Sequence, residues 1–270
     1  MKTLRIGVLI WCALLLPSRA ALAAEISVVD GLVQEFAVEP GRKVEGKLLV
    51  RNNTDKEQQV RIYQTDYLFR ANGDNTYGEP GSAPRSNSSW STFTPRELVI
   101  PARETSPVFY AVQVPPDQKL VGTYWSMLMV EPVSASFDIA RTEDGRPVVN
   151  IRTVIRYGVQ FVTNIGDSGR REIKFLDKQL VLKDGELILR LDIENTGEKG
   201  LRPSVWAELY NKDGTSVGRF GSEQLRIYPG CSARFDIGLP QLAKGQYSAL
   251  IVADNLDDYV FGAQCTLRIE

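Results

Sequence analysis

The 270-residue chain contains no histidine, and this absence removes many kinds of active site. Imidazole is the usual proton carrier near neutral pH, a frequent zinc ligand and a member of most hydrolytic triads. The acidic residues are scattered through turns, such as those at 184–185 and 213–214, and are not paired. Asp beside Gly is typical of turns. We therefore expect a protein that is not an enzyme and that has no cofactor or metal.

Long hydrophobic runs are also lacking. The run at residues 6–16 is well short of the roughly 20 residues that span a bilayer. Lys2 and Arg5 lie at its start, and Ala21-Leu22-Ala23 follows it as a small-residue cleavage site. This order predicts a cleaved signal peptide over residues 1–23. We expect an exported protein, located in the periplasm or at the cell surface, that does not span the membrane.

The rest of the chain has no excess of basic residues over acidic ones. The sequence has 32 basic and 33 acidic residues, and the predicted signal peptide contains three of the basic ones. The mature chain would therefore be acidic overall. Because binding to nucleic acid requires a basic surface, we expect no nucleic-acid partner.

Cysteine is nearly absent beyond the predicted signal peptide, where only Cys231 and Cys265 occur. Export places both in an oxidising compartment, which favours a disulfide between them. The alternative is two buried thiols in separate strands. Sequence does not give the Cα separation that a disulfide requires, so both interpretations stay open.

No segment shows a sustained helical period, and strand-like segments recur along the whole chain. We predict an all-β fold of two immunoglobulin-like β-sandwiches in tandem, over residues 24–165 and 166–270. The predicted strands of the first sandwich are 32–38, 44–52, 58–69, 96–100, 108–114, 124–131 and 148–162. Those of the second are 173–182, 187–194, 204–211, 217–220, 224–227, 233–239, 245–253 and 260–269.

A short echo in the sequence supports two copies of one fold. Asn53-Thr54 ends one predicted strand, and Asn195-Thr196 ends another in the second half. Asn bonds its own main chain readily, so this step is typical of a strand that ends in a turn. Residues 71–91 are predicted to form a long exposed loop. Tyr247 is either a tyrosine corner, whose phenol bonds back to a loop carbonyl, or plain core.

Residues 148–162 form the longest predicted strand, well beyond the usual length of about five or six residues. One interpretation is a final strand that is paired wholly within its own domain. The other is strand addition, in which main-chain hydrogen bonds supply affinity for a partner and alternate side chains fill its groove. The partner-binding residues would then be Val149, Ile151, Ile155, Arg156, Tyr157 and Val159.

Several segments of the first half follow one another in a recognisable order. They are 41–54, 93–101, 114–117, Tyr124-Trp125 and the long strand. This order, over residues 30–162, resembles the PapD-like periplasmic pilus chaperones. The resemblance implies two immunoglobulin-like domains that hold an exported, β-rich pilus or surface subunit by donating a strand.

The resemblance also implies a basic pair in the cleft between the domains, with one member on the first strand and one on the donor strand. The first-strand segment 32–38 carries Glu35 and no basic residue. On the donor strand, the candidates for a polar anchor are Arg156 and Arg152.

A second resemblance suggests an alternative function. Residues 87–93, 101–104 and 121–130 are similar to sandwich domains of envelope proteins that bind peptidoglycan or another surface protein. In that case the N-terminal sandwich would bind the ligand, with Trp90 as the candidate contact. Trp125 and Trp206 are predicted to pack in the cores.

Overall fold

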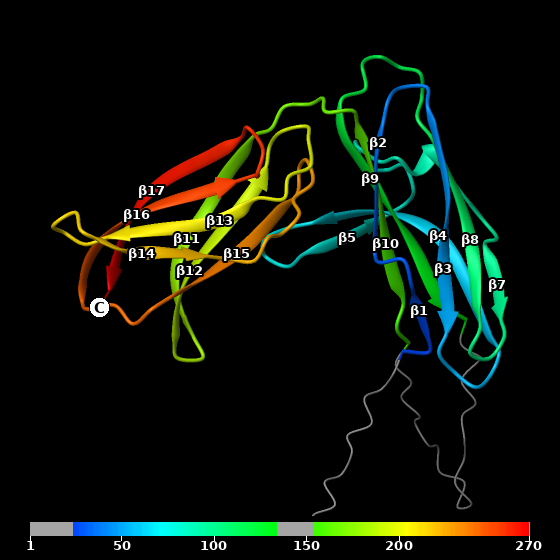
Figure 1. Ribbon diagram of the computed structural model, residues 1–270, viewed down its shortest axis with the longest axis horizontal. Helices are drawn as coiled ribbons and strands as arrows, with labels where there is room; N and C mark the ends of the chain where they lie inside the picture. Colours follow the sequence, from blue (N-terminus) through cyan, green and yellow to red (C-terminus); the bar gives the residue numbers. More distant parts are fainter. Residues whose placement is uncertain (1–23, 134–153, 270) are drawn as a thin grey trace, which may run out of the picture.

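The computed structural model describes residues 24–133 and 154–269, which form β-strands and one short 3-10 helix. The strands make two β-sandwiches that lie at an angle to each other (Figure 1). Within the described ranges, no strand pairs across the two sandwiches. The predicted fold class, all-β with two immunoglobulin-like sandwiches, is confirmed. The predicted signal peptide lies outside the described residues.

The first sandwich contains the strands that precede residue 166. They are β1 (Ile26–Val28), β2 (Val33–Val38), β3 (Lys43–Asn52), β4 (Gln58–Phe69), β5 (Asn75–Gly78), β6 (Ser91–Thr94), β7 (Glu97–Ile100), β8 (Thr105–Gln113), β9 (Gly122–Pro132) and β10 (Tyr157–Ile165), with the 3-10 helix η1 (Ser88–Trp90). One sheet has the order β1-β3-β8-β6, and the other has β2-β10-β9-β4-β5 with β7 beside β4. Strand β2 runs parallel to β10.

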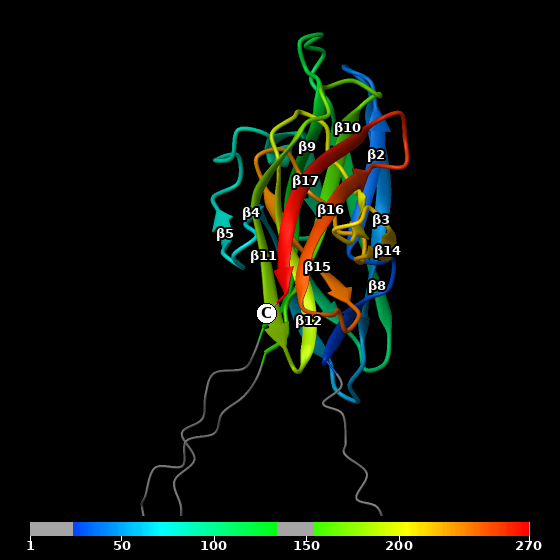
Figure 2. The same ribbon diagram turned by 90° about the vertical axis from the view of Figure 1, so that its left-hand side faces the viewer.

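The second sandwich contains seven described strands in two antiparallel sheets, as in an immunoglobulin-like domain. They are β11 (Ile173–Lys183), β12 (Glu186–Asn195), β13 (Ser204–Tyr210), β14 (Ser216–Gly221), β15 (Ser232–Leu239), β16 (Gly245–Asp254) and β17 (Val260–Ile269). The sheet orders are β11-β12-β15 and β14-β13-β16-β17. In Figure 2 the second sandwich lies in front of the first. The proposed domain boundary, after residue 165, falls at the end of β10.

Two-residue alternation explains how these strands pack. In β12, Leu189, Leu191 and Ile193 are fully buried in the core of the second sandwich. Arg190, between them, faces outward and forms a bidentate ion pair with Asp236 of β15, at 2.9 and 3.0 Å. The guanidinium of Arg190 lowers the pKa of the Asp236 carboxyl. The apolar face therefore fills the core while the polar face is satisfied at the surface.

Several strand predictions are correct, and β4 has the predicted bounds. The predicted strand 148–162 is wrong: within the described residues it begins at Tyr157 and ends at Ile165, and 154–156 are not in a strand. Segment 224–227 is not a strand either, because Ile227 makes only an isolated bridge. Short strands β1, β5 and β6 were missed, since three or four residues carry too little alternation to be recognised.

The predicted exposed loop at 71–91 is partly built into the fold. It contains β5 and η1, and the buried carboxylate of Asp66 holds its middle part. This carboxylate accepts hydrogen bonds from the N–H of Ala83 at 2.7 Å and from the hydroxyl of Ser86 at 2.5 Å. Asn87, also buried, donates to the carbonyl of Phe161 at 3.0 Å. The hydrogen bonds of Asp66 and Asn87 therefore hold the loop against the sheet.

Asn195 organises the turn after β12. Its side-chain amide donates to the carbonyl oxygens of Lys199 at 2.8 Å and Ile227 at 2.9 Å. Its side-chain oxygen accepts the N–H of Gly197 at 2.9 Å. Asn195 is fully buried, so it satisfies backbone groups that water does not reach.

The equivalent residue in the first sandwich is Asn52 and not Asn53. Asn52 donates to the carbonyls of Lys56 at 2.7 Å and Ile100 at 3.0 Å, and it accepts the N–H of Thr54 at 2.9 Å. These contacts have the same pattern as those of Asn195. The echo is therefore real, but the alignment of Asn53 with Asn195 is wrong by one residue.

Tyr247 is a tyrosine corner, because its hydroxyl donates to the carbonyl of Ala243 at 2.9 Å. The predicted disulfide is not present: Cys231 and Cys265 are free thiols. Cys231 is buried directly before β15, whereas Cys265 lies within β17 of the other sheet, opposite Ala249. Burial raises the pKa of both thiols.

Trp206 does not lie in the core. Its neighbours in β13, Val205 and Ala207, are fully buried, so alternation places Trp206 on the outer face, where it is half-buried. The guanidinium of Arg219 lies over its ring, 3.5 Å from the ring centroid. Trp206 therefore packs against a cation on the surface of the sheet.

The paired asparagines give a test of the corrected alignment. Asn52→Ala leaves buried backbone groups without partners, so it should lower the free energy of unfolding by about 2–4 kcal/mol. Asn53→Ala, at a half-buried position, should lower it by about 1 kcal/mol or less. Denaturant titration of both variants measures the difference. Equal losses would contradict the equivalence of Asn52 and Asn195.

Candidate functional site

In the part of the chain that the structure describes, the start of β10 is paired on one side only. Strand β10 pairs with β9 along its whole length, from Tyr157 to Ile165. On its other side, β2 pairs only from Gln160 onward, and the N–H of Gln160 donates to the carbonyl of Leu32 at 2.9 Å. Within the described residues, Tyr157, Gly158 and Val159 therefore have an open edge.

Exposed apolar side chains lie next to this open edge. Strands β2 and β10 run parallel, and their pairing begins at Val33 and Gln160. The segments that come just before these two residues in the chain therefore lie at the same end of the paired region. The exposed apolar residues there are Leu32, Val33, Val154 and Ile155, which we call the apolar rim. Leu32 is 44% exposed and Ile155 is 42% exposed. An open edge beside apolar side chains has the two features that strand addition uses.

The predicted partner-binding residues fall into different environments. Ile155 belongs to the apolar rim, and Tyr157 is half-buried against the core of the first sandwich. Val159 is fully buried in that core, so its side chain serves its own domain. Val149 and Ile151 lie outside the described residues.

Arg156 is exposed at the end of β10 that is remote from the second sandwich. Its charge acts on Tyr63 and Glu131. Burial, followed by Glu131, raises the pKa of the Tyr63 hydroxyl. Arg152, the other candidate anchor, lies outside the described residues.

Glu35, the acid in the predicted first strand, pairs with a cation from the second sandwich. Glu35 of β2 forms an ion pair with Arg226, 2.6 Å from carboxylate oxygen to guanidinium nitrogen. The amide of Asn164 donates to the other Glu35 oxygen at 2.9 Å. The cation that meets the first strand in this cleft therefore comes from the second sandwich. Sequence reasoning missed Arg226 because 191 positions separate it from Glu35.

Stacked aromatic rings form the apolar part of the contact between the sandwiches. Trp125 of β9 stacks on Tyr228, with ring centroids 4.8 Å apart and planes inclined by 22°. Phe69 of β4 meets the same Tyr228 ring edge-on at 5.9 Å. Tyr228 is 1% exposed, and burial raises its pKa. The prediction that Trp125 is a packing residue is confirmed, and its core is the one shared by both sandwiches.

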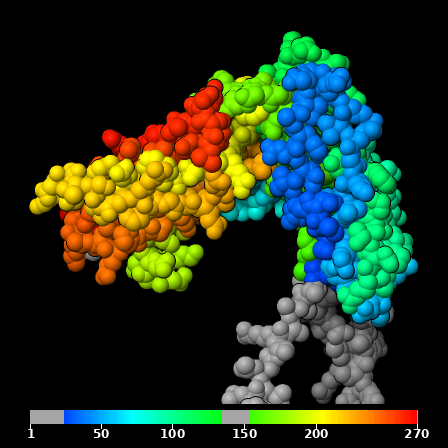
Figure 3. Space-filling view, in the orientation of Figure 1, coloured from blue at the N-terminus to red at the C-terminus, as the bar shows by residue number. Residues whose placement is uncertain are grey.

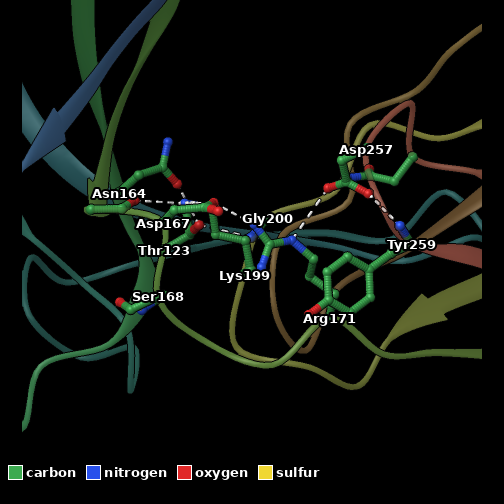
Figure 4. A network of polar contacts seen from close by, with 12 residues as sticks. Thr123, Asn164, Asp167, Ser168, Arg171, Lys199, Gly200, Asp257 and Tyr259 are labelled. Atoms are coloured by element: carbon green, nitrogen blue, oxygen red, sulfur yellow. Dashed lines mark hydrogen bonds and ion pairs between the residues drawn. The ribbon is translucent and has the colours of Figure 1, made fainter.

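Polar atoms of the interface are also paired. The Trp125 indole donates to the carbonyl of Tyr67 at 2.7 Å, and the Tyr228 hydroxyl donates to Gln160 of β10. Figure 4 shows a second group of contacts, in which the Thr123 hydroxyl accepts the N–H of Gly200 at 2.7 Å and donates to Asn164 at 2.6 Å. The interface thus joins β9 and β10 directly to the second sandwich.

The segment between the sandwiches is held by charges from both sides. Lys199 donates to the carbonyl of Gly166 at 2.9 Å and lies 3.7 Å from Asp167. Arg171 pairs with Asp167 and, at 3.3 Å, with Asp257, as Figure 4 shows. Burial lowers the pKa of Lys199, and the charge of Asp167 opposes that shift. These contacts restrict the movement of residues 164–170.

Close backbone approach at this point requires glycine. Gly122 has a φ of 76°, and a Cβ atom there would lie 2.0 Å from the carbonyl oxygen of Glu198. The N–H of Thr123 donates to that same oxygen at 2.8 Å. A side chain at position 122 would therefore separate the two sandwiches.

The β4–β5 hairpin makes a further contact with the second sandwich. The N–H of Ala71 donates to the Ser232 hydroxyl at 2.9 Å, and Arg70 donates to the carbonyl of Gly230. Arg70 also lies 3.9 Å from Glu194. A hollow of about 600 Å³ lies beside this contact, between Arg70 and Trp125. The hairpin therefore adds contacts between the sandwiches to those made by Gly166, Asp167 and Arg171.

Trp90, the candidate ligand contact, is half-buried. Its ring packs on that of Tyr124, with centroids 4.6 Å apart, and it contributes to the core of the first sandwich. One face of the indole is therefore used within the protein.

No family model and no curated protein sequence matches this chain. Similar solved structures include a chain of the chaperone–tip adhesin complex of CFA/I fimbriae biogenesis, at 12% identity and a TM-score of 0.49, which covers 90% of this chain and 98% of that one. The class 5 fimbriae chaperone CfaA has 12% identity, coverage of 91% and 99%, and a TM-score of 0.45. The E. coli chaperone DraB has 13% identity, coverage of 90% and 98%, and a TM-score of 0.42. The fold assignment itself rests on the strand order described above.

The aromatic stack gives a test of the interface. Tyr228→Ala removes a buried ring that both sandwiches share, so it should cost about 3–5 kcal/mol and let the sandwiches unfold separately. Calorimetry should then resolve two transitions in place of one. Tyr210→Ala, on the outer face of β13, is the matched control and should leave the profile almost unchanged. The same profile in both variants would contradict a shared core.

Proposed function

We propose that this protein is a periplasmic chaperone, or a chaperone-like assembly factor, that binds exported pilus or surface subunits by β-strand addition. The open edge of β10 beside the apolar rim is the observation that carries the proposal. A folding subunit with an incomplete sheet needs backbone partners and apolar cover at the same place. The start of β10 offers both.

The chemistry of the edge suits a strand of another protein. Gln160 directs its N–H toward β2, so alternation along β10 directs the N–H of Gly158 to the same, open side. The apolar rim lies where the pairing of β2 with β10 begins. An added strand would pair with β10 just before this point, in line with β2. The incoming strand would bury apolar side chains against Leu32, Val33 and Ile155.

The proposed role needs no chemical turnover. The partner would be recognised through main-chain hydrogen bonds and burial of apolar surface, which require neither a nucleophile nor a metal. The firm contact between the sandwiches supports this role, because an edge held in one geometry loses less conformational entropy when it binds.

The proposal is tested by charging the apolar rim. Ile155→Asp places a carboxylate beside the open edge, so a subunit that co-purifies with the wild-type protein from its native host should be lost or strongly reduced. The measurement is pull-down of the tagged variant followed by identification of the bound proteins.

Phe109→Asp is the matched control, because Phe109 is 52% exposed on β8 of the other sheet. It should retain the subunit, and circular dichroism should show that both variants are folded. If Ile155→Asp retained the subunit as well as the control does, strand addition at β10 would be wrong.

A further inference from the structure

The edge strands of the second sandwich differ in how they are protected from pairing with another chain. Natural sheets protect edges with charged residues, bulges or short strands. Strand β11 has a bulge between Phe175 and Asp177 and carries several lysines. Strand β14 has six residues, a shifted register and Gly218 at a φ of 144°. Strands β11 and β14 are therefore poor templates for an added strand.

Strand β17 lacks these protections within its described residues. It has ten residues, pairs with β16 in an unbroken register from Val260 to Ile269, and contains no proline. Its single charged residue is Arg268, near one end. Figure 3 shows this strand, in red, along the surface of the second sandwich. Among the described strands only β16 pairs with it, so the backbone donors and acceptors on its outer side have no strand partner there.

The side chains of β17 divide cleanly between two faces. Gly262, Gln264 and Thr266 are exposed and uncharged, and Val260 is 60% exposed. The alternate residues, such as Cys265, turn toward the core. A strand added at this edge would therefore extend an apolar layer on one face and a polar layer on the other.

We propose that the β17 edge pairs with β17 of a second copy of this chain, antiparallel about a twofold axis at Cys265. Side chains alternate between the two faces of a strand. When the twofold axis passes through a residue, each core-facing side chain of one copy therefore lies opposite a core-facing side chain of the other. In this register Gln264 faces Thr266 of the second copy, and Ala263 faces the larger Leu267. Arg268 faces Gly262, so no like charges meet.

A second copy fits this edge because a twofold interface must be complementary to itself. The small–large pairing of Ala263 with Leu267 and the polar pairing of Gln264 with Thr266 each occur twice. The edge belongs to the second sandwich, whereas the open edge of β10 belongs to the first. Self-association would therefore leave the proposed subunit-binding edge available, and its test is independent of the test at Ile155.

The test is sedimentation velocity of the mature protein over a concentration series. The wild type should show a monomer–dimer equilibrium. Gln264→Lys/Thr266→Lys puts lysine opposite lysine twice in the proposed register, so it should weaken dimerisation by about tenfold. Gln264→Lys/Thr266→Glu puts lysine opposite glutamate twice and should dimerise at least as well as the wild type.

Val217→Lys, on the β14 edge, is the control and should dimerise like the wild type. Circular dichroism checks that every variant is folded. A wild type that stays monomeric at the highest soluble concentration would overturn the proposal. So would a Lys/Glu variant that is weakened as much as the Lys/Lys variant, because the axis would then not lie at Cys265.

Discussion

The stacked contact of Trp125 with Tyr228 is the interaction on which the rest of the structure depends. It joins β9 of the first sandwich to the second, and the two rings belong to one buried cluster. Around it, the exposed ion pair of Glu35 with Arg226 and the hydrogen bond from Gly200 to Thr123 add polar contacts between the sandwiches. Burial of a shared aromatic core makes the orientation of the sandwiches a consequence of packing, since separating them would expose both rings.

This constraint reaches the open edge of β10. The hinge-side half of the strand is paired with β2 and β9, and Gln160 also binds Tyr228 of the second sandwich. The opposite half has only β9, and the apolar rim lies beside it. One strand therefore combines a fixed half with an accessible half. Such an arrangement presents backbone donors and acceptors in an ordered geometry, which lowers the entropy cost of adding a strand.

The sequence predicted the elements that carry long alternation, such as β4, and the two-sandwich fold. It did not predict the contacts between Glu35 and Arg226, because local patterns hold no information on partners far apart in the chain. The placement of Trp125 had a visible signal, since an apolar run at residues 127–130 follows it closely, and a continuous apolar strand is covered on both faces. The predicted long strand failed at residues 154–156, because alternation of apolar residues there is not accompanied by pairing.

The central claim is that a partner strand pairs with the open half of β10. Amide hydrogen exchange of the free protein and of its complex with a co-purified subunit tests it most directly. The account predicts that the amide of Gly158 exchanges quickly in the free protein and becomes protected in the complex, because its N–H faces the open edge. If the amide of Gly158 exchanged at the same rate in both while another surface became protected, the account would be contradicted.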